Sequence, residues 1–202
     1  MNPATFNFPV ISEIVAGAWV ENTVRGDPTL EPAAIAAARR LVERGAVAIS
    51  SSCGFFIRHQ PAVAAAVKVP VALSSLILLP ALLRQLPPAA KIALLTYDSI
   101  CCNNDLLGVS PSERARIVIA GVEGGEFWHN ALKRPPRPTE LDVVEKDVTA
   151  SLARIRSAHP DIAAILLECA RFPLVAPAIR RAAKLPVYDI THLCRMMLTS
   201  IT

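Results

Sequence analysis

Apolar runs alternate with amphipathic segments along almost the whole chain. Short apolar runs typical of buried strands occupy 10–16, 46–51, 71–73, 91–96, 115–121, 162–167 and 187–189. Helical spacing, often opened by proline, lies between them at 31–44, 60–68, 76–86, 139–158, 173–184 and 191–198. Thr139 is the expected N-cap of the longest helix. The irregular stretch 124–138 predicts an exposed loop carrying Trp128 and His129, either as a lid or interface or as a surface loop with a packed Trp. Apolar strands separated by helices predict an α/β fold, with a parallel sheet covered by helices on both faces.

Composition and charge exclude several classes of protein. The chain has 202 residues, 52% of them hydrophobic and 19% charged, which suffices for one medium domain or two small lobes. The net charge of +4 is dispersed and aromatic residues make up only 5%, so nucleic-acid binding is disfavoured. The chain does not open with a signal-peptide pattern, and the longest uncharged apolar segment after residue 50, at 69–83, is too short for a bilayer. We therefore expect a cytoplasmic protein with neither a nucleic-acid nor a membrane partner.

The five cysteines, at positions 53, 101, 102, 169 and 194, contain no CxxC pair. This spacing argues against a disulfide framework and against a zinc site. The histidines at 59, 129 and 159 also lack ligand-like spacing, so no metal site is expected. Reduced thiols without a metal partner are the expectation.

An internal repeat relates two of these cysteines. Cys169 follows Cys53 by 116 residues, and the same offset aligns 45–77 with 161–193 at 10 identities in 33 positions. Each copy contains an apolar strand, a cysteine, a proline-initiated helix and then Lys-x-Pro-Val, which opens the next strand. Such agreement in one register indicates a duplication.

The repeat predicts where the two thiols lie. Ligands of parallel α/β sheets bind beyond the carboxyl ends of strands, which is where Cys53 and Cys169 fall. If the two copies face each other about a pseudo-two-fold axis, one thiol can act as base and the other as acid to invert a carbon stereocentre. The alternative is that both are packing residues, since cysteine is often buried. Cys101, Cys102 and Cys194 have no such pairing and are expected to be structural.

Residues beside the expected strand ends are candidates for substrate binding. Ser51, Ser52 and Gly54 can supply hydroxyl and main-chain N–H groups to a carboxylate. Thr96 follows a central strand, with turn and capping chemistry as its alternative role. His192 begins the last helix, where a local hydrogen bond is an equal alternative to substrate contact. Glu168, next to Cys169, is expected to raise the pKa of that thiol or to cap a loop.

These residues resemble those of the aspartate/glutamate/hydantoin racemase superfamily. The resemblance rests on Ser51-Ser52-Cys53-Gly54-Phe55, on Leu167-Glu168-Cys169-Ala170 and on 186–190 downstream. It implies two pseudo-symmetric, flavodoxin-like lobes, residues 1–97 with 186–202 and residues 98–185, with the active site in the cleft between them. It also implies a racemase or epimerase that needs no cofactor, with Cys53 and Cys169 as acid and base, a small carboxylate or amino acid as substrate, and often a homodimer.

The chain departs from the family pattern in ways that change the expected substrate. Gly54-Phe55 and Ala170-Arg171 stand where glutamate racemases have Asn-Thr and Thr-His, which disfavours glutamate itself, and Ala170 and Arg171 are further candidates for substrate binding. Phe55 and Phe56 suggest a more apolar or bulkier ligand, with packing in the core as the alternative for either side chain. Related chains have a further strand before the stretch 2–10, so a late start is expected. Two alternatives stay open: a single-cysteine decarboxylase or cis-dicarboxylate isomerase of the same superfamily, and a non-catalytic member that binds a small carboxylate.

Overall fold

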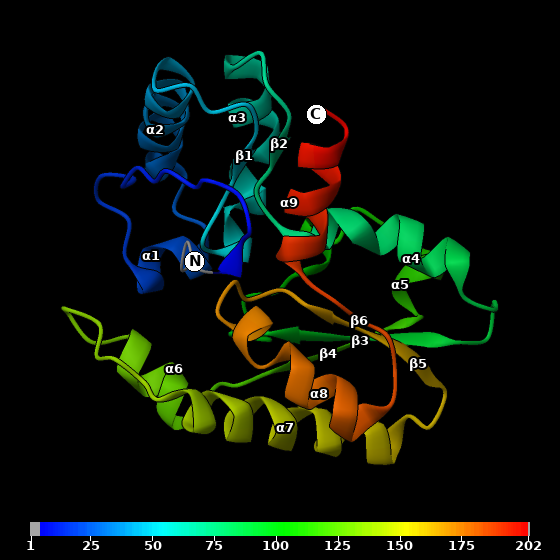
Figure 1. Ribbon diagram of the computed structural model, residues 1–202. Coiled ribbons are helices and arrows are strands. Elements are labelled where there is room, and N and C mark those ends of the chain that lie inside the picture. Colours follow the sequence, from blue (N-terminus) through cyan, green and yellow to red (C-terminus); the bar gives the residue numbers. More distant parts are fainter. Residues whose placement is uncertain (1–4, 202) are drawn as a thin grey trace.

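The computed structural model describes residues 5–201 and has an α/β fold (Figure 1). Residues 1–4, at the start of the segment in which no signal-peptide pattern was found, lie outside that range. The strands are β1 (Ile49–Ser50), β2 (Val71–Ala72), β3 (Lys91–Thr96), β4 (Ile117–Gly121), β5 (Ile162–Leu167) and β6 (Val187–Tyr188). Within the described residues they form a parallel two-stranded sheet, β1-β2, and a parallel four-stranded sheet in the order β4-β3-β5-β6.

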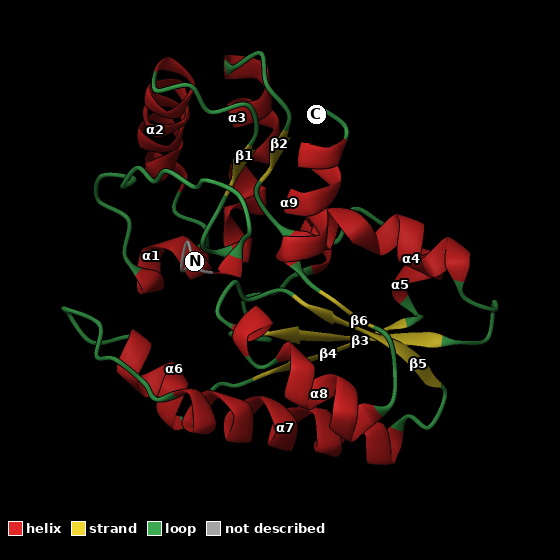
Figure 2. Cartoon of the chain, in the orientation of Figure 1, coloured by secondary structure: helices red, strands yellow, loops and turns green. Residues whose placement is uncertain are grey.

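Helices connect and cover these strands (Figure 2). The α-helices are α1 (Val20–Arg25), α2 (Glu31–Glu43), α3 (Gln60–Ala66), α4 (Leu79–Gln85), α5 (Pro111–Arg114), α6 (Glu126–Ala131), α7 (Leu141–Ala158), α8 (Ala176–Ala183) and α9 (Ile190–Thr199). The 3-10 helices are η2 (Pro28–Leu30), η3 (Gly54–His59), η4 (Ser75–Leu78), η5 (Asn104–Leu106) and η6 (Phe172–Leu174).

The larger core surrounds the four-stranded sheet. Residues 92–96 of β3 and 164–167 of β5 are buried, because helices cover both faces of these central strands. Figure 1 shows α7 and α8 on one face of this sheet and α4 on the other. The helix α7 contributes Val144, Val148 and Leu152, whose four-residue spacing keeps them on one buried face.

The smaller sheet has its own apolar cluster, and α9 lies beside both sheets. Ala34 and Ala38 of α2 pack with Ile49 of β1 and Val63 of α3. Leu193 belongs to a third cluster, in which α9 packs with residues from the ends of both β2 and β5. The C-terminal helix is therefore a shared packing element of the two sheets.

The duplication inferred from the sequence is confirmed by strand register. Ile49 pairs with Val71, and the residues 116 positions later, Ile165 and Val187, pair in the same way. The main-chain N–H groups of Ile49 and Ile165 donate to the carbonyls at positions 70 and 186, each at 2.9 Å. The two copies thus share backbone geometry as well as sequence.

Two expected elements are wrong. Residues 10–16 are irregular rather than a strand, and Ile14 is 86% exposed. Instead of strand pairing, Glu13 forms ion pairs with Arg40 and Arg44 of α2. The expected loop at 124–138 contains the helix α6. Asp147 of α7 supports the first turn of α6 by accepting a 3.0 Å hydrogen bond from the Phe127 N–H.

The start of α7 also differs from expectation. Its N-cap is Glu140, while the Thr139 hydroxyl accepts a 3.2 Å hydrogen bond from the Asn130 side chain. The expected lobe boundaries stay a prediction. The strands β3 and β6, expected in the first lobe, both pair with β5, which is expected in the second lobe. No helix among residues 5–201 is long and apolar enough to cross a membrane.

Candidate active site

Cys53 and Cys169 lie in matching loops beyond β1 and β5. The main-chain N–H groups of Phe55 and Phe56 lower the pKa of the Cys53 thiol, and the Phe56 N–H donates a 3.1 Å hydrogen bond to the Cys53 carbonyl. Those of Arg171 and Phe172, each 116 residues later, lower the pKa of the Cys169 thiol, and the Phe172 N–H donates a 3.0 Å hydrogen bond to the Cys169 carbonyl. In both loops a 3-10 helix, η3 or η6, begins within three residues of the cysteine, so its first N–H groups point back at the thiol. The two loops therefore place equivalent main-chain N–H groups beside the two thiols.

The same loops are otherwise unfavourable for a negative charge. Burial raises the pKa of the Cys53 thiol to about 12, and the Glu168 carboxylate raises it further. Burial likewise raises the pKa of Cys169, with added repulsion from Glu168 and from an ionised Cys53. The two thiols are thus close enough for their charges to interact, and both are protonated at neutral pH in the free chain.

Glu168 is a buried carboxylate between the two cysteine loops. Its residue is 1% exposed, its Oε2 accepts a 2.7 Å hydrogen bond from the Thr96 hydroxyl, and its Oε1 has no hydrogen-bond partner in the described residues. Oε1 lies against Gly54, where an added Cβ would approach it to 2.2 Å. Burial raises the pKa of Glu168 to about 7, although hydrogen bonds from Thr96 and the Tyr97 main chain lower it.

Aromatic side chains pack beside these groups. Tyr97 follows β3, and burial raises its pKa, with smaller contributions from the charges of Cys169 and Cys53. Its ring stacks on Trp128 at 6.4 Å between centroids and meets Phe127 edge-on at 5.7 Å. Its hydroxyl donates a 2.8 Å hydrogen bond to the Trp128 carbonyl of α6. The segment expected to be an exposed loop therefore packs against a residue near the thiols.

The residues preceding and following Cys53 have distinct positions. The Ser51 hydroxyl accepts a 3.0 Å hydrogen bond from the Cys53 N–H and donates one of 2.9 Å to the Cys53 carbonyl. Ser52 is exposed, whereas Gly54 is buried. Phe55 is 1% exposed and belongs to the main core, which confirms the packing alternative for its side chain.

The candidates on the second loop and on α9 are more dispersed. Ala170 is buried in the cluster around α9. Arg171 is exposed, and its guanidinium donates a 3.0 Å hydrogen bond to the Thr139 carbonyl. His192 Nδ1 accepts a 3.3 Å hydrogen bond from the Asp189 N–H and lies 3.1 Å from the Asp189 carboxylate in a capping box. The local role considered for His192 is confirmed; its contact with substrate stays a prediction.

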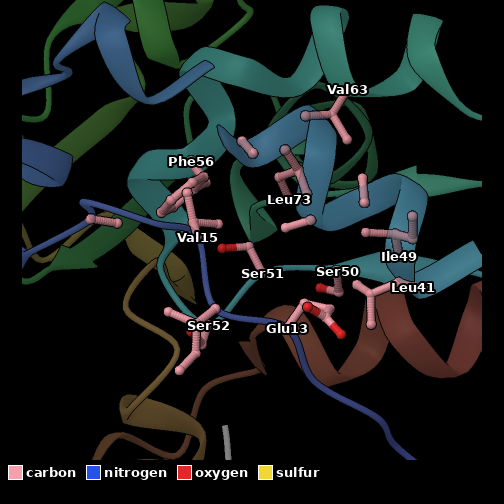
Figure 3. A pocket seen from close by; sticks show the side chains of 15 residues that line it. Glu13, Val15, Leu41, Ile49, Ser50, Ser51, Ser52, Phe56, Val63 and Leu73 are labelled. Carbon is pink, nitrogen blue, oxygen red and sulfur yellow. The ribbon is translucent and has the colours of Figure 1, made fainter. Parts of the chain in front are cut away.

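A cavity of about 300 Å³ lies next to the smaller sheet but does not contain the cysteines (Figure 3). Glu13, Val15, Leu41 and Phe56 line it together with Ser50, Ser51 and Ser52. The cavity lies between the irregular segment around Glu13, the helix α2 and the strand β1. Within the described residues the smaller sheet consists of β1 and β2 alone, so no further strand pairs with β1. The cavity's lining is mostly apolar and excludes both thiols, so the cavity and the cysteine loops are separate features of the structure.

Two features of the site were missed by sequence reasoning. Tyr97 was noted only as part of a turn after β3, and no local signal indicates that its ring reaches the thiols. Glu168 was expected to affect Cys169, but its contact with Gly54 joins residues 114 positions apart in sequence. Within residues 5–201 no group of three His, Cys, Asp or Glu side chains is arranged to hold a metal ion.

Comparison with known proteins assigns this fold to a class. No family model matches the chain. Among solved structures, glutamate racemase from Francisella tularensis superposes with a TM-score of 0.59 at 16% identity, covering 94% of this chain and 67% of that chain. A glycine-to-cysteine variant of arylmalonate decarboxylase gives 0.50 at 17% identity, covering 82% and 72%. The chain has the fold of the aspartate/glutamate racemase superfamily, which confirms the resemblance seen in its sequence.

The sequence relatives carry the names of lyases rather than racemases. The chain is 31% identical over 199 residues to a dimethylsulfoniopropionate lyase from Durusdinium sp. clade D, covering 93% of this chain and 64% of the relative. It is 30% identical over 211 residues to dimethylsulfoniopropionate lyase 6 of Emiliania huxleyi, covering 99% and 55%. The chain thus spans less than two thirds of the length of these relatives.

Proposed function

We propose that this chain is a lyase that acts on dimethylsulfoniopropionate, with Cys53 and Cys169 at the reaction centre. The observation that carries the proposal is the pair of matching cysteine loops within a chain that is 31% identical to such a lyase across 93% of its residues. The racemase expected from the sequence is replaced as first candidate, because the relatives reported above are lyases. The proposed site lies between the two repeat copies, as the two-lobe expectation requires.

The reaction begins with removal of a proton from the carbon next to the substrate carboxylate. One thiolate takes this proton, and the electron pair of the C–H bond forms the C=C bond. The C–S bond to the sulfonium then breaks, and its electron pair leaves with dimethyl sulfide. The products are acrylate, dimethyl sulfide and a proton, which remains on the thiol until it passes to solvent.

The chain's own groups have clear roles in this scheme. The N–H groups of residues 55, 56, 171 and 172 hold the thiolate that forms. Arg171, exposed two residues after Cys169, is the cation proposed for the substrate carboxylate, with Ser52 exposed beside Cys53. No step in this scheme requires a cofactor.

Racemisation or epimerisation of a small carboxylate is the second candidate. The equivalent main-chain N–H groups beside the two thiols favour it, because exchange of acid and base roles needs equivalent groups on the two faces of the substrate. Both candidates share the first proton abstraction. They differ in whether a leaving group is expelled or the proton returns on the opposite face.

The test is release of dimethyl sulfide from dimethylsulfoniopropionate, measured in the headspace by gas chromatography. We expect turnover by the 202-residue chain and a loss of at least about a hundredfold in Cys53→Ser and in Cys169→Ser. Cys101→Ser is the matched control, since Cys101 is also half-buried but lies outside both loops. Absence of dimethyl sulfide, together with deuterium exchange of a chiral amino acid or hydantoin in D₂O, would instead establish the racemase.

A further inference from the structure

Glu168 is a buried charge that the proposed reaction does not use. Its Oε1 has no donor among the described residues, although the residue is 99% shielded from solvent. Leaving a carboxylate oxygen in this state costs stability, so such groups call for a functional explanation. Glu168 cannot help to ionise the thiols, because its charge raises the pKa values of both Cys53 and Cys169.

The position of Glu168 places its charge at the reaction centre. Oε1 lies against Gly54, the residue that follows Cys53, while the Glu168 main chain leads directly into Cys169. The carboxylate is held from the other side by Thr96, through a 2.7 Å hydrogen bond to Oε2. A carboxylate that ionises around pH 7 therefore lies between the two cysteine loops.

Among the main groups that shift the pKa values of Cys53 and Cys169, Glu168 raises both, and no cationic side chain of residues 5–201 is found. Aromatic rings lie near the thiols, since the charges of both thiols act on Tyr97, whose ring stacks on Trp128. Carboxylates and aromatic faces are both groups that bind sulfonium and quaternary ammonium cations.

We propose that Glu168 is a specificity-determining residue that selects substrates with a cationic group on the carbon β to the carboxylate. The inference rests on the proposed lyase, whose substrate carries a sulfonium at that carbon. A bound cation neutralises Glu168 and offsets its repulsion of the thiolate, so the substrate itself makes deprotonation of a thiol easier. An uncharged substrate of the same shape leaves the repulsion in place and binds more weakly.

The test uses two isosteric ligands that need not react. The two ligands are 3-(trimethylammonio)propionate and 4,4-dimethylpentanoate. They have the same shape, but the first has a positively charged nitrogen where the second has a neutral quaternary carbon. Isothermal titration calorimetry at pH 8.5 is expected to show that the chain prefers the cationic ligand by at least about tenfold. Glu168→Gln is expected to abolish this preference, whereas Glu145→Gln, which removes an exposed carboxylate on α7, keeps it.

Two further measurements separate charge from structure. Thr96→Val removes the hydrogen bond to Oε2 but leaves the carboxylate, so the preference at pH 8.5 is retained. In the native chain the preference rises with pH as Glu168 ionises around its pKa of about 7, and in Glu168→Gln it is flat. Cys53, Cys102 and Cys169, the other titratable groups that interact with Glu168, stay protonated over pH 6 to 8.5 because their pKa values are raised.

The outcomes distinguish this inference from the proposed function. Equal affinity for the two ligands, or a preference that survives Glu168→Gln in a folded variant, overturns the role of Glu168 even if dimethyl sulfide is released. A preference that depends on Glu168 without any dimethyl sulfide release supports the cation site and overturns the proposed lyase. Circular dichroism and thermal unfolding confirm that each variant is folded.

Discussion

The Thr96 hydroxyl, at the end of β3, donates a 2.7 Å hydrogen bond to the Glu168 carboxylate just beyond β5. This contact joins the carboxyl ends of the two central strands of the larger sheet, which pair along their length. It leaves one carboxylate oxygen unpaired next to the Cys53 loop. Stability and the chemistry of the thiols therefore depend on the same side chain.

Glu168 is expected to make stability depend on pH. Its pKa is raised from an ordinary 4.5 to about 7 in the folded chain. Between these values the unfolded chain loses the proton while the folded chain keeps it, so the free energy of unfolding falls as pH rises. The contribution is on the order of 3 kcal/mol, fully present below pH 4.5 and lost above pH 7.

Urea unfolding at several pH values measures this effect. The stability of Glu168→Gln relative to the native chain should increase across the window from pH 4.5 to 7, because glutamine does not ionise. Glu145→Gln, on the exposed face of α7, should follow the native curve. Parallel curves for the native chain and Glu168→Gln would show that Glu168 ionises normally.

Gly54 is expected to be required for its small size. An added Cβ would lie 2.2 Å from Glu168 Oε1 and 2.5 Å from the Glu168 carbonyl oxygen, so Gly54→Ala must displace the Cys53 loop. We expect a loss of about 1–3 kcal/mol in the free energy of unfolding and a fall of about tenfold or more in dimethyl sulfide release.

Gly108→Ala is the matched control for that substitution. Gly108 has a φ of 62° but nothing within 4 Å of an added Cβ. Its replacement should cost about 1–2 kcal/mol through backbone strain alone and leave the activity per folded molecule unchanged. Equal activity losses in both variants would assign the Gly54 effect to general destabilisation.

Alkylation of Cys53 is expected to be slow at pH 8. With a pKa of about 12 only a small fraction of the thiol is ionised, and the thiolate is the reactive species. Peptide mapping after iodoacetamide treatment should show Cys53 reacting at least about tenfold more slowly than free cysteine. Glu168→Gln should accelerate the reaction, since the carboxylate raises this pKa; an unchanged rate would mean that burial alone protects the thiol.

The Tyr97 hydroxyl is expected to contribute to the packing of α6. Tyr97→Phe removes its 2.8 Å hydrogen bond to the Trp128 carbonyl and should lower the free energy of unfolding by about 1 kcal/mol. Tyr188→Phe is the comparison, because no hydroxyl hydrogen bond of Tyr188 is found within residues 5–201, and it should change stability by less than about 0.5 kcal/mol. Equal effects would indicate that the Tyr97 hydrogen bond is not formed in solution.

Strongly patterned elements were predictable from sequence, and weakly patterned ones were not. Strands β3 and β5 have the predicted bounds, because each is an unbroken apolar run that can only be buried. Residues 10–16 are similarly apolar but remain irregular, with Glu13 held by two arginines of α2. The short helix α6 was missed because Asp147, twenty residues away, supports its first turn.

The sequence by itself determined the α/β class, the duplication and the equivalence of Cys53 and Cys169, because strand periodicity and a shared register are local properties of the chain. Only the tertiary structure brought Glu168 against Gly54 and Tyr97 near the thiols, since these contacts depend on how distant strands pair and on which side chains burial leaves without partners. That environment raises the pKa values of both thiols; the effect of Glu168 on the adjacent Cys169 follows from the sequence, whereas its effect on Cys53 and the burial of both thiols do not.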